Sequence, residues 1–130
     1  MQNKPLTIGK LAKSAGVNVE TIRYYQKIGL LKTPHKPQTG YRQYSHNSIA
    51  IINFIKRSQK LGFSLTEINN LISLGENNCD DVCNYTKQKR NQIENQIIEL
   101  KELQSNLDTL IKSCQSDLPV CPIVTTLSKN

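Results

Sequence analysis

The sequence lacks any hydrophobic run long enough to cross a membrane. No stretch of about 18 apolar residues occurs, and residues 1–5 (MQNKP) do not start a signal-peptide core. We therefore expect a cytoplasmic protein without a membrane partner. Enzyme signatures are also missing: there is no nucleophile elbow, no phosphate loop and no paired acid and base, and both histidines lie far from the cysteines. No catalytic site is expected.

Acidic residues are scarce in the first half of the chain. Residues 1–62 contain eleven Lys or Arg and one acid, Glu20, for a net charge of +10, and residues 63–130 contain six bases and nine acids, for −3. A basic half of this kind favours the phosphate backbone of nucleic acid. A membrane surface is an alternative, but no basic amphipathic helix with bulky aromatics is present. A merely solvated basic face is the other alternative.

The first basic segment has the pattern of a helix-turn-helix. Residues 7–14 predict a short helix capped by Thr7, residues 15–18 contain the glycine turn, and a second helix is predicted from residue 19 to residue 27. In such a motif the second helix enters the major groove of DNA. The residues predicted on or beside its exposed face are Thr21, Arg23 and Tyr24.

Residues 30–44 lose the helical pattern and predict a wing of two short strands. The turn-forming residues are Pro34, Pro37 and Gly40. Tyr41 and Arg42 on such a loop suit contacts to phosphate and sugar beside the groove. For Tyr44, packing against the helices is an equally good interpretation.

Two further helices complete the predicted basic domain. One spans about residues 45–61, with the apolar set Ile49, Ile52, Phe54 and Ile55. Arg57 and Lys60 near its end are further candidates for phosphate contacts. The next helix starts with a capping box of Ser64 and Glu67. Its predicted buried side consists of Leu65, Ile68, Leu71, Ile72 and Leu74.

A long helix is predicted after this domain. Residues 1–75 form the predicted DNA-binding domain, residues 76–78 a polar linker, residues 79–113 a dimerisation helix, and residues 114–130 a metal-binding loop with a last helical turn. Apart from a first gap of seven, apolar residues of the helix recur at steps of three and four, which is typical of a helix that packs along a partner helix. They are Ile93, Leu100, Leu103, Leu107, Leu110 and Cys114.

Four cysteines lie at the two ends of this helix: Cys79, Cys83, Cys114 and Cys121. At about 1.5 Å per residue, Cys79 and Cys114 of one chain are about 45–50 Å apart and cannot share a ligand. If two helices pair antiparallel, each end of the dimer gathers three or four thiols, which predicts a metal site created by dimerisation. Cytoplasmic thiols stay reduced, so ligands are favoured over disulfides. The alternative is a thiol redox sensor in which Cys114 and Cys121 form a disulfide.

Four segments carry a resemblance to a known family. Residues 6–12 (LTIGKLA), 19–25 (VETIRYY), 40–44 (GYRQY) and 61–65 (LGFSL) resemble, in order and spacing, the signature segments of MerR-family metal-responsive transcription regulators. The resemblance implies a mostly α protein: a winged helix-turn-helix, an antiparallel coiled-coil helix and a short metal-binding loop. It also implies a homodimer on a palindromic promoter, which the metal-bound form distorts so that RNA polymerase can engage both promoter elements.

The resemblance also assigns residues to sites. Arg23, Tyr24 and Tyr25 fall on the recognition-helix signature, and Tyr41 and Arg42 fall on the wing. The family's three metal thiolates match Cys79, Cys114 and Cys121, with Cys79 from the other subunit.

The cysteine set bears on which metal is bound. In family members that sense monovalent copper or silver, the residue at Cys79 is a serine, so this chain is expected to bind a thiophilic divalent ion. Three thiolates suit Hg²⁺ or Pb²⁺, whereas Zn²⁺ and Cd²⁺ prefer a fourth donor, for which Cys83 is a candidate. Residues 121–124 resemble mercury sensors, but the gap between Cys114 and Cys121 resembles cadmium and lead sensors. We expect Hg²⁺ ahead of Cd²⁺ or Pb²⁺, and Zn²⁺ last.

Overall fold

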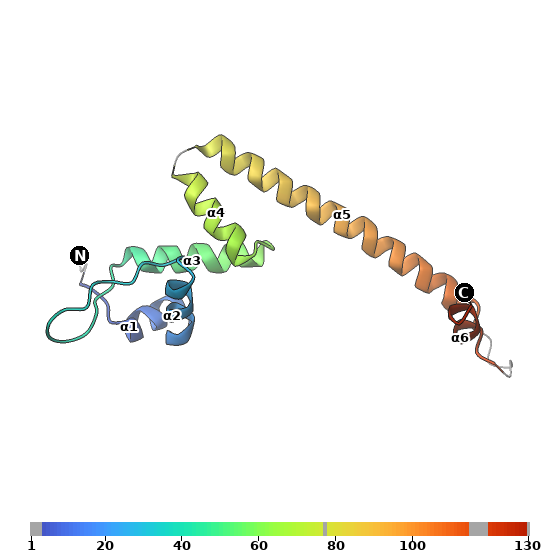
Figure 1. Ribbon diagram of the computed structural model, residues 1–130, viewed down its shortest axis with the longest axis horizontal. Coiled ribbons are helices and arrows are strands. Elements are labelled where there is room, and N and C mark those ends of the chain that lie inside the picture. Colours follow the sequence, from blue (N-terminus) through green and yellow to red (C-terminus); the bar gives the residue numbers. More distant parts are fainter. Residues whose placement is uncertain (1–3, 77, 115–119, 130) are drawn as a thin grey trace. The chain divides into compact units, whose positions relative to one another are not determined.

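All regular secondary structure in the described residues is helical. The computed structural model describes residues 4–76, 78–114 and 120–129 (Figure 1). By their contacts, the residues divide into two compact units, Met1–Val82 and Cys83–Asn130. Among the described residues, no helix is both long enough and apolar enough to cross a membrane. The helices are α1 (Ile8–Ala15), α2 (Val19–Lys27), α3 (Asn47–Lys60), α4 (Leu65–Gly75), α5 (Cys79–Lys112) and α6 (Pro122–Leu127).

Helix α1 starts directly after its predicted cap, and α2 starts at the predicted residue, Val19. The Thr7 side chain accepts a hydrogen bond from the backbone N–H of Lys10 at 3.3 Å. Asn18 caps α2 in the same way, accepting from the N–H of Thr21 at 2.8 Å. Gly16 ends α1 with φ of 69°, a left-handed conformation that glycine adopts without strain. The predicted pair of short helices joined by a glycine turn is therefore confirmed.

The core of the first unit forms where α1 packs against α2 and α3, and where α3 packs against α4. Its largest fully buried side chains are Leu11, Ile22, Ile52, Ile55 and Ile68. The Lys56 ammonium donates to the Ala15 carbonyl at 2.9 Å, which satisfies a backbone acceptor at the end of α1.

The prediction that Phe54 belongs to the buried set of α3 is wrong. Its side chain is 42% exposed. At about 100° per residue Phe54 lies about 200° around the helix from Ile52, so the two cannot share one face. Phe54 instead borders a shallow apolar hollow between α3 and α4.

The predicted pair of strands in the wing is also not found in the described residues. Residues 30–44 form a long loop (Figure 1), and its one isolated β-bridge joins Tyr44 to Leu6 rather than to another part of the loop. The backbone N–H groups of Leu6 and Tyr44 each donate to the other residue's carbonyl, at 2.8 and 2.7 Å. Pro34 and Pro37 lack the N–H that a strand ladder requires, which explains why no ladder extends through the loop.

Helix α4 begins with the predicted capping box. The Ser64 hydroxyl oxygen accepts from the N–H of Glu67 at 3.1 Å, and the Glu67 carboxylate accepts from the N–H of Ser64 at 2.8 Å. Of the predicted buried side, Ile68 and Leu71 are buried. The other members are half-buried: Leu65, Ile72 and Leu74.

Helix α5 is 34 residues long and contains no buried residue. The predicted apolar residues lie exposed along it, except for Leu110, which is half-buried. Ile97 and Ile111 widen this stripe, since each lies four residues after one of its members. Helix α6 follows with Cys121 as its N-cap and Pro122 in its first turn. Residue 77 of the predicted linker and residues 115–119 of the predicted metal-binding loop lie outside the described residues.

The capping box can be tested by replacing Ser64. Ser64→Ala should lower the free energy of unfolding by about 1 kcal/mol, because the N–H of Glu67 loses its acceptor. Ser64→Asp is the matched control and should retain the stability of the wild type, since aspartate is an equally good N-cap. Urea unfolding at one fixed protein concentration measures both. Equal losses in the two variants would contradict the role of the cap.

Candidate nucleic-acid interface and metal-ligating cysteines

Helix α2 presents three of the predicted DNA-contacting residues toward solvent. Arg23 is exposed and Tyr24 is 50% exposed. Thr21 is half-buried, and its hydroxyl donates to the Asn18 side chain at 2.8 Å. Because the Thr21 hydroxyl already donates its hydrogen to Asn18, only its oxygen lone pairs are available to a further partner, as acceptors.

Tyr25 lies in the core, which corrects the expectation that its side chain contacts DNA. Only 5% of the residue is exposed, because it faces inward from α2 with Ile22. Desolvation by burial raises the pKa of the Tyr25 hydroxyl. The recognition-helix signature therefore combines surface residues with a core residue. Tyr25 is the core residue because it lies three residues after Ile22, on the same face of α2.

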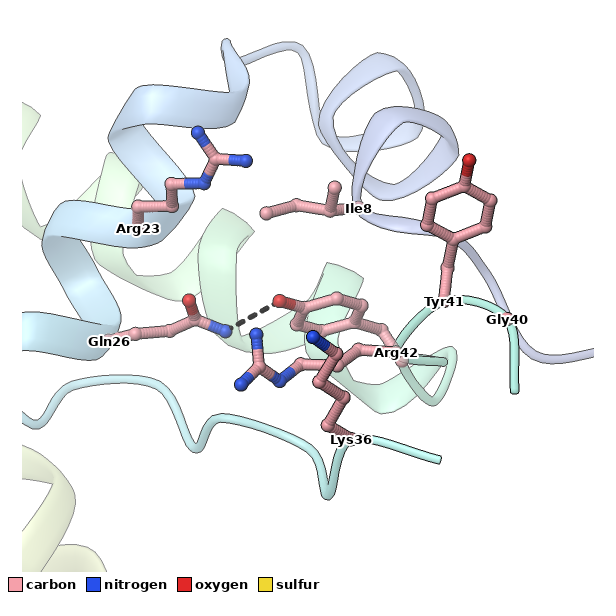
Figure 2. A pocket seen from close by; sticks show the side chains of 8 residues that line it. Ile8, Arg23, Gln26, Lys36, Gly40, Tyr41 and Arg42 are labelled. Carbon is pink, nitrogen blue, oxygen red and sulfur yellow. Dashed lines mark hydrogen bonds between the residues drawn. The ribbon is translucent and has the colours of Figure 1, made fainter. Parts of the chain in front are cut away.

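A cavity of about 370 Å³ opens between α2 and the long loop (Figure 2). We name this space the cationic cleft. Figure 2 shows Arg23 projecting from α2 on one side, with Lys36 and Arg42 coming from the loop on the other. The lining residues are Ile8, Arg23, Gln26, Lys36, Gly40, Tyr41, Arg42 and Tyr44.

Tyr44 connects the loop to α2 at the cationic cleft. The residue is 3% exposed, so the interpretation in which it packs on the helices is confirmed. Its phenolic oxygen accepts a hydrogen bond from the Gln26 side-chain amide at 2.7 Å, drawn as the dashed line in Figure 2. Together with the bridge to Leu6, this bond holds the end of the loop against α2.

The cationic cleft contains three positive charges and no acid among its lining residues. Sequence reasoning identified Arg23 and Arg42 but missed Lys36 as a site residue. Lys36 lies between two prolines in the acid-poor half of the chain, which could have indicated a basic residue on the exposed loop. Gln26 was also missed, and no local pattern indicates it, because its partner lies 18 residues away.

The other predicted DNA contacts lie outside this cleft, except for Tyr41. Tyr41 also lines the cleft but is 81% exposed, so most of its ring is open to solvent. Arg57 and Lys60 are exposed in the last turn of α3 and are not among the lining residues. They remain candidates for a separate contact to phosphate.

The four cysteines are free and exposed. Cys79 is the first residue of α5 and Cys83 lies one turn later, whereas Cys114 follows the end of the helix. The backbone N–H of Cys114 donates to the Ile111 carbonyl at 2.9 Å, and Cys121 occupies the N-cap position of α6 without a capping hydrogen bond from its side chain. Within residues 4–76, 78–114 and 120–129, no three His, Cys, Asp or Glu side chains are close enough together to hold a metal ion.

The histidines belong to the first unit and are not near the cysteines along the chain. The ring of His46 hydrogen-bonds to the Lys4 carbonyl at 2.7 Å, and His35 is exposed on the loop. Thiols are therefore the available soft ligands.

Tyr24 and Tyr25 offer a direct test of the surface and core assignment. Tyr25→Ala should lower the free energy of unfolding by about 3–5 kcal/mol, because it leaves a cavity in the core. Tyr24→Ala should lower DNA affinity while changing stability by less than about 0.5 kcal/mol. The matched variant Tyr25→Phe keeps the packing and should leave DNA affinity unchanged. Urea unfolding and fluorescence anisotropy with labelled DNA measure the two effects, and a loss of affinity in Tyr25→Phe would contradict the assignment.

Two family models match the chain. The model described as "MerR HTH family regulatory protein" covers residues 6–74, and that described as "MerR, DNA binding" covers residues 49–110. Among curated relatives, the mercuric resistance operon regulatory protein of Bacillus cereus is 41% identical over 127 residues, which span 94% of this chain and 96% of that protein.

Solved structures show the same architecture. The transcription regulator PbrR691 from Ralstonia metallidurans CH34, in complex with lead(II), matches with a TM-score of 0.84 and 29% identity over 95% of this chain and 99% of that chain. MerR from Bacillus megaterium MB1, in complex with mercury(II), matches with a TM-score of 0.76 and 37% identity over 95% and 100%. The expected fold class is thereby confirmed. The chain belongs to the MerR family of helix-turn-helix regulatory proteins, which are transcription regulators and not enzymes.

Proposed function

We propose that this protein is a metal-responsive transcription regulator that binds promoter DNA as a homodimer and activates transcription when a thiophilic divalent ion binds. The observation that carries the proposal is the placement of four free, exposed thiols at the two ends of a 34-residue helix. Residues 1–75 bind DNA, residues 76–78 link, residues 79–113 dimerise and residues 114–130 form the metal-binding loop. Such a regulator works in the cytoplasm, where promoter DNA and reduced thiols occur together.

The donor set fits a soft ion. Thiolates select soft or borderline cations over Mg²⁺, Ca²⁺ or Mn²⁺, and the thiols of this chain are not used in disulfides. Cys79, Cys114 and Cys121 provide three donors, which suit Hg²⁺ or Pb²⁺, and Cys83 is the candidate fourth donor for Cd²⁺ or Zn²⁺. The mercury regulators among the relatives support Hg²⁺ as the first choice, with Cd²⁺ or Pb²⁺ next and Zn²⁺ last.

Dimerisation through α5 would complete the metal site. The exposed apolar stripe of α5, with Leu100, Leu103 and Leu107 at its centre, needs a partner helix to remove it from water. A helix of 34 residues is about 50 Å long, so its two ends cannot share one ion. In an antiparallel pair, Cys79 of one chain meets Cys114 and Cys121 of the other.

The same arrangement would transmit metal binding to the DNA-binding helices. Cys79 starts α5 directly after the helices that carry the nucleic-acid interface, so an ion that ties it to the other chain's Cys114 and Cys121 acts at the connection between sensing and DNA binding. The metal-bound dimer would bend and untwist the promoter, and RNA polymerase would then engage both promoter elements. Binding of the ion to these thiolates provides the free-energy difference between the metal-free and the metal-bound states of the dimer.

The dimer is tested by placing a charge in the apolar stripe. Leu107→Asp should convert the dimer into a monomer, because an aspartate buried between two helices has no compensating partner. Thr109→Asp adds the same charge to the same helix outside the stripe and should remain dimeric. Sedimentation equilibrium gives the mass of each variant. A Leu107→Asp protein that stays fully dimeric would exclude α5 as the dimer contact.

The shared metal site is tested with mixed dimers. Titration of reduced wild-type protein, followed by thiolate-to-metal absorption, should give two ions per dimer. Cys79→Ser and Cys114→Ser homodimers should each bind at least about tenfold more weakly, because each loses one donor at both ends. A mixed dimer of the two variants, isolated by two different affinity tags, should recover one ion bound with wild-type affinity, since one of its ends keeps all its cysteines.

Cys83→Ser is the matched cysteine control for this experiment. It should retain Hg²⁺ affinity, and a loss restricted to Cd²⁺ or Zn²⁺ would identify Cys83 as a fourth donor. A mixed dimer that recovers no ion would show that the site is not shared between chains. If no soft ion binds, and oxidation instead joins Cys114 to Cys121 and changes transcription, the alternative of a thiol redox sensor is correct.

A further inference from the structure

The cationic cleft holds its three positive charges without any counter-charge. Arg23, Lys36 and Arg42 line one cavity, no acid lines it, and none of the three forms an ion pair in the part of the chain that the structure describes. Like charges in one concave space repel each other, and they attract an anion that neutralises them. The charge pattern is therefore that of an anion-binding site.

Tyr44 adds a hydrogen-bond donor to the same cleft. A phenol has one hydroxyl hydrogen to donate and oxygen lone pairs to accept with. The Tyr44 oxygen accepts from Gln26 at 2.7 Å, and no acceptor for the Tyr44 hydrogen is found among the described residues. Because Tyr44 is buried and lines the cleft, its hydroxyl is held in a fixed place from which it can donate to a bound anion.

We propose that the cationic cleft is a phosphate-binding site, in which Arg23, Lys36 and Arg42 bind one phosphate group and the Tyr44 hydroxyl donates to the same group. The inference rests on the proposed binding of DNA and assigns Lys36 and Tyr44 to it. Gln26 is a positioning residue, because it acts on the phosphate only by orienting the Tyr44 hydroxyl.

The shape of the cleft favours a phosphate of the DNA backbone over a free ion. Its volume of about 370 Å³ is roughly that of a dozen waters, which leaves room for the sugar next to a phosphate group. One wall is α2, the helix expected to enter the major groove, so a backbone phosphate at the groove edge would lie beside it. A free phosphate ion has the same chemistry and is distinguished by experiment.

The first measurement is DNA affinity as a function of KCl concentration, by fluorescence anisotropy with the full-length protein. Lys36→Ala should lower affinity and reduce the magnitude of the log–log salt slope by about one, because one phosphate contact is lost. Tyr44→Phe should lower affinity by about tenfold with an unchanged slope, because it removes a hydrogen bond to a charged group but no charge. Lys101→Ala, an equal charge change on α5, should alter neither quantity. Thermal unfolding of each variant separates these effects from loss of fold.

Gln26→Ala tests whether Gln26 acts by orienting the Tyr44 hydroxyl. In the wild-type background it should weaken DNA binding, and in the Tyr44→Phe background it should have no further effect, because the hydroxyl that it orients is already absent. Equal losses in both backgrounds would show that Gln26 does not act through Tyr44.

A titration of DNA-free protein with inorganic phosphate at constant ionic strength, followed by NMR chemical shifts, identifies the source of the phosphate. Binding by the wild type that Lys36→Ala abolishes supports the site and shows that it also accepts the free ion. Wild-type DNA binding that Lys36→Ala leaves unchanged in affinity and salt slope overturns the site while the proposed function stands. If the wild type binds no DNA, the proposed function fails, and absence of phosphate binding then overturns the site as well.

Discussion

The length of α5 is the constraint on which the proposed chemistry depends. A helix advances about 1.5 Å per residue, so 34 residues make a rod about 50 Å long. Thiols at its two ends cannot meet within one chain, and no group of three metal-ligating side chains forms within the described residues. In the proposed dimer, metal sensing would therefore depend on assembly, because the apolar stripe along which the two helices pair also determines which cysteines come together.

In the first unit, the residues that pack the core are distinct from the residues that carry charge. Its core is made by aliphatic side chains of four helices, together with two tyrosines and three residues outside the helices, Leu30, Leu31 and Phe63. The basic residues remain at the surface, where only one acid occurs in the first 62 residues to neutralise them. Lys56 is an exception, because its ammonium is used to satisfy a backbone carbonyl at the end of α1. A positive surface on a rigid helical support suits a partner whose backbone carries regular negative charge.

Short-range features of the fold were predictable because their causes are local. Helix caps depend on residues three positions apart, and Thr7, Asn18 and Ser64 all cap the helices that follow them. The glycine turns also depend on neighbouring residues, and the apolar stripe of α5 depends on a regular spacing along the chain, so both could be predicted from the sequence. Errors arose where the helical period was not followed or a distant partner intervened. Phe54 was assigned to the wrong face of α3. The predicted strand pair of the loop does not form, because its two prolines lack the N–H that a ladder requires and Tyr44 bonds to Leu6 instead.

The sequence by itself determined the helix order, the family, the basic half and the cysteine spacing, because each of these is encoded by residue type and interval along the chain. Only the tertiary structure decided that Tyr44 is held by Gln26 and that Lys36 lines one cleft with Arg23 and Arg42. Those facts depend on contacts between residues far apart in the chain, which form only when the helices pack, and no local pattern records them.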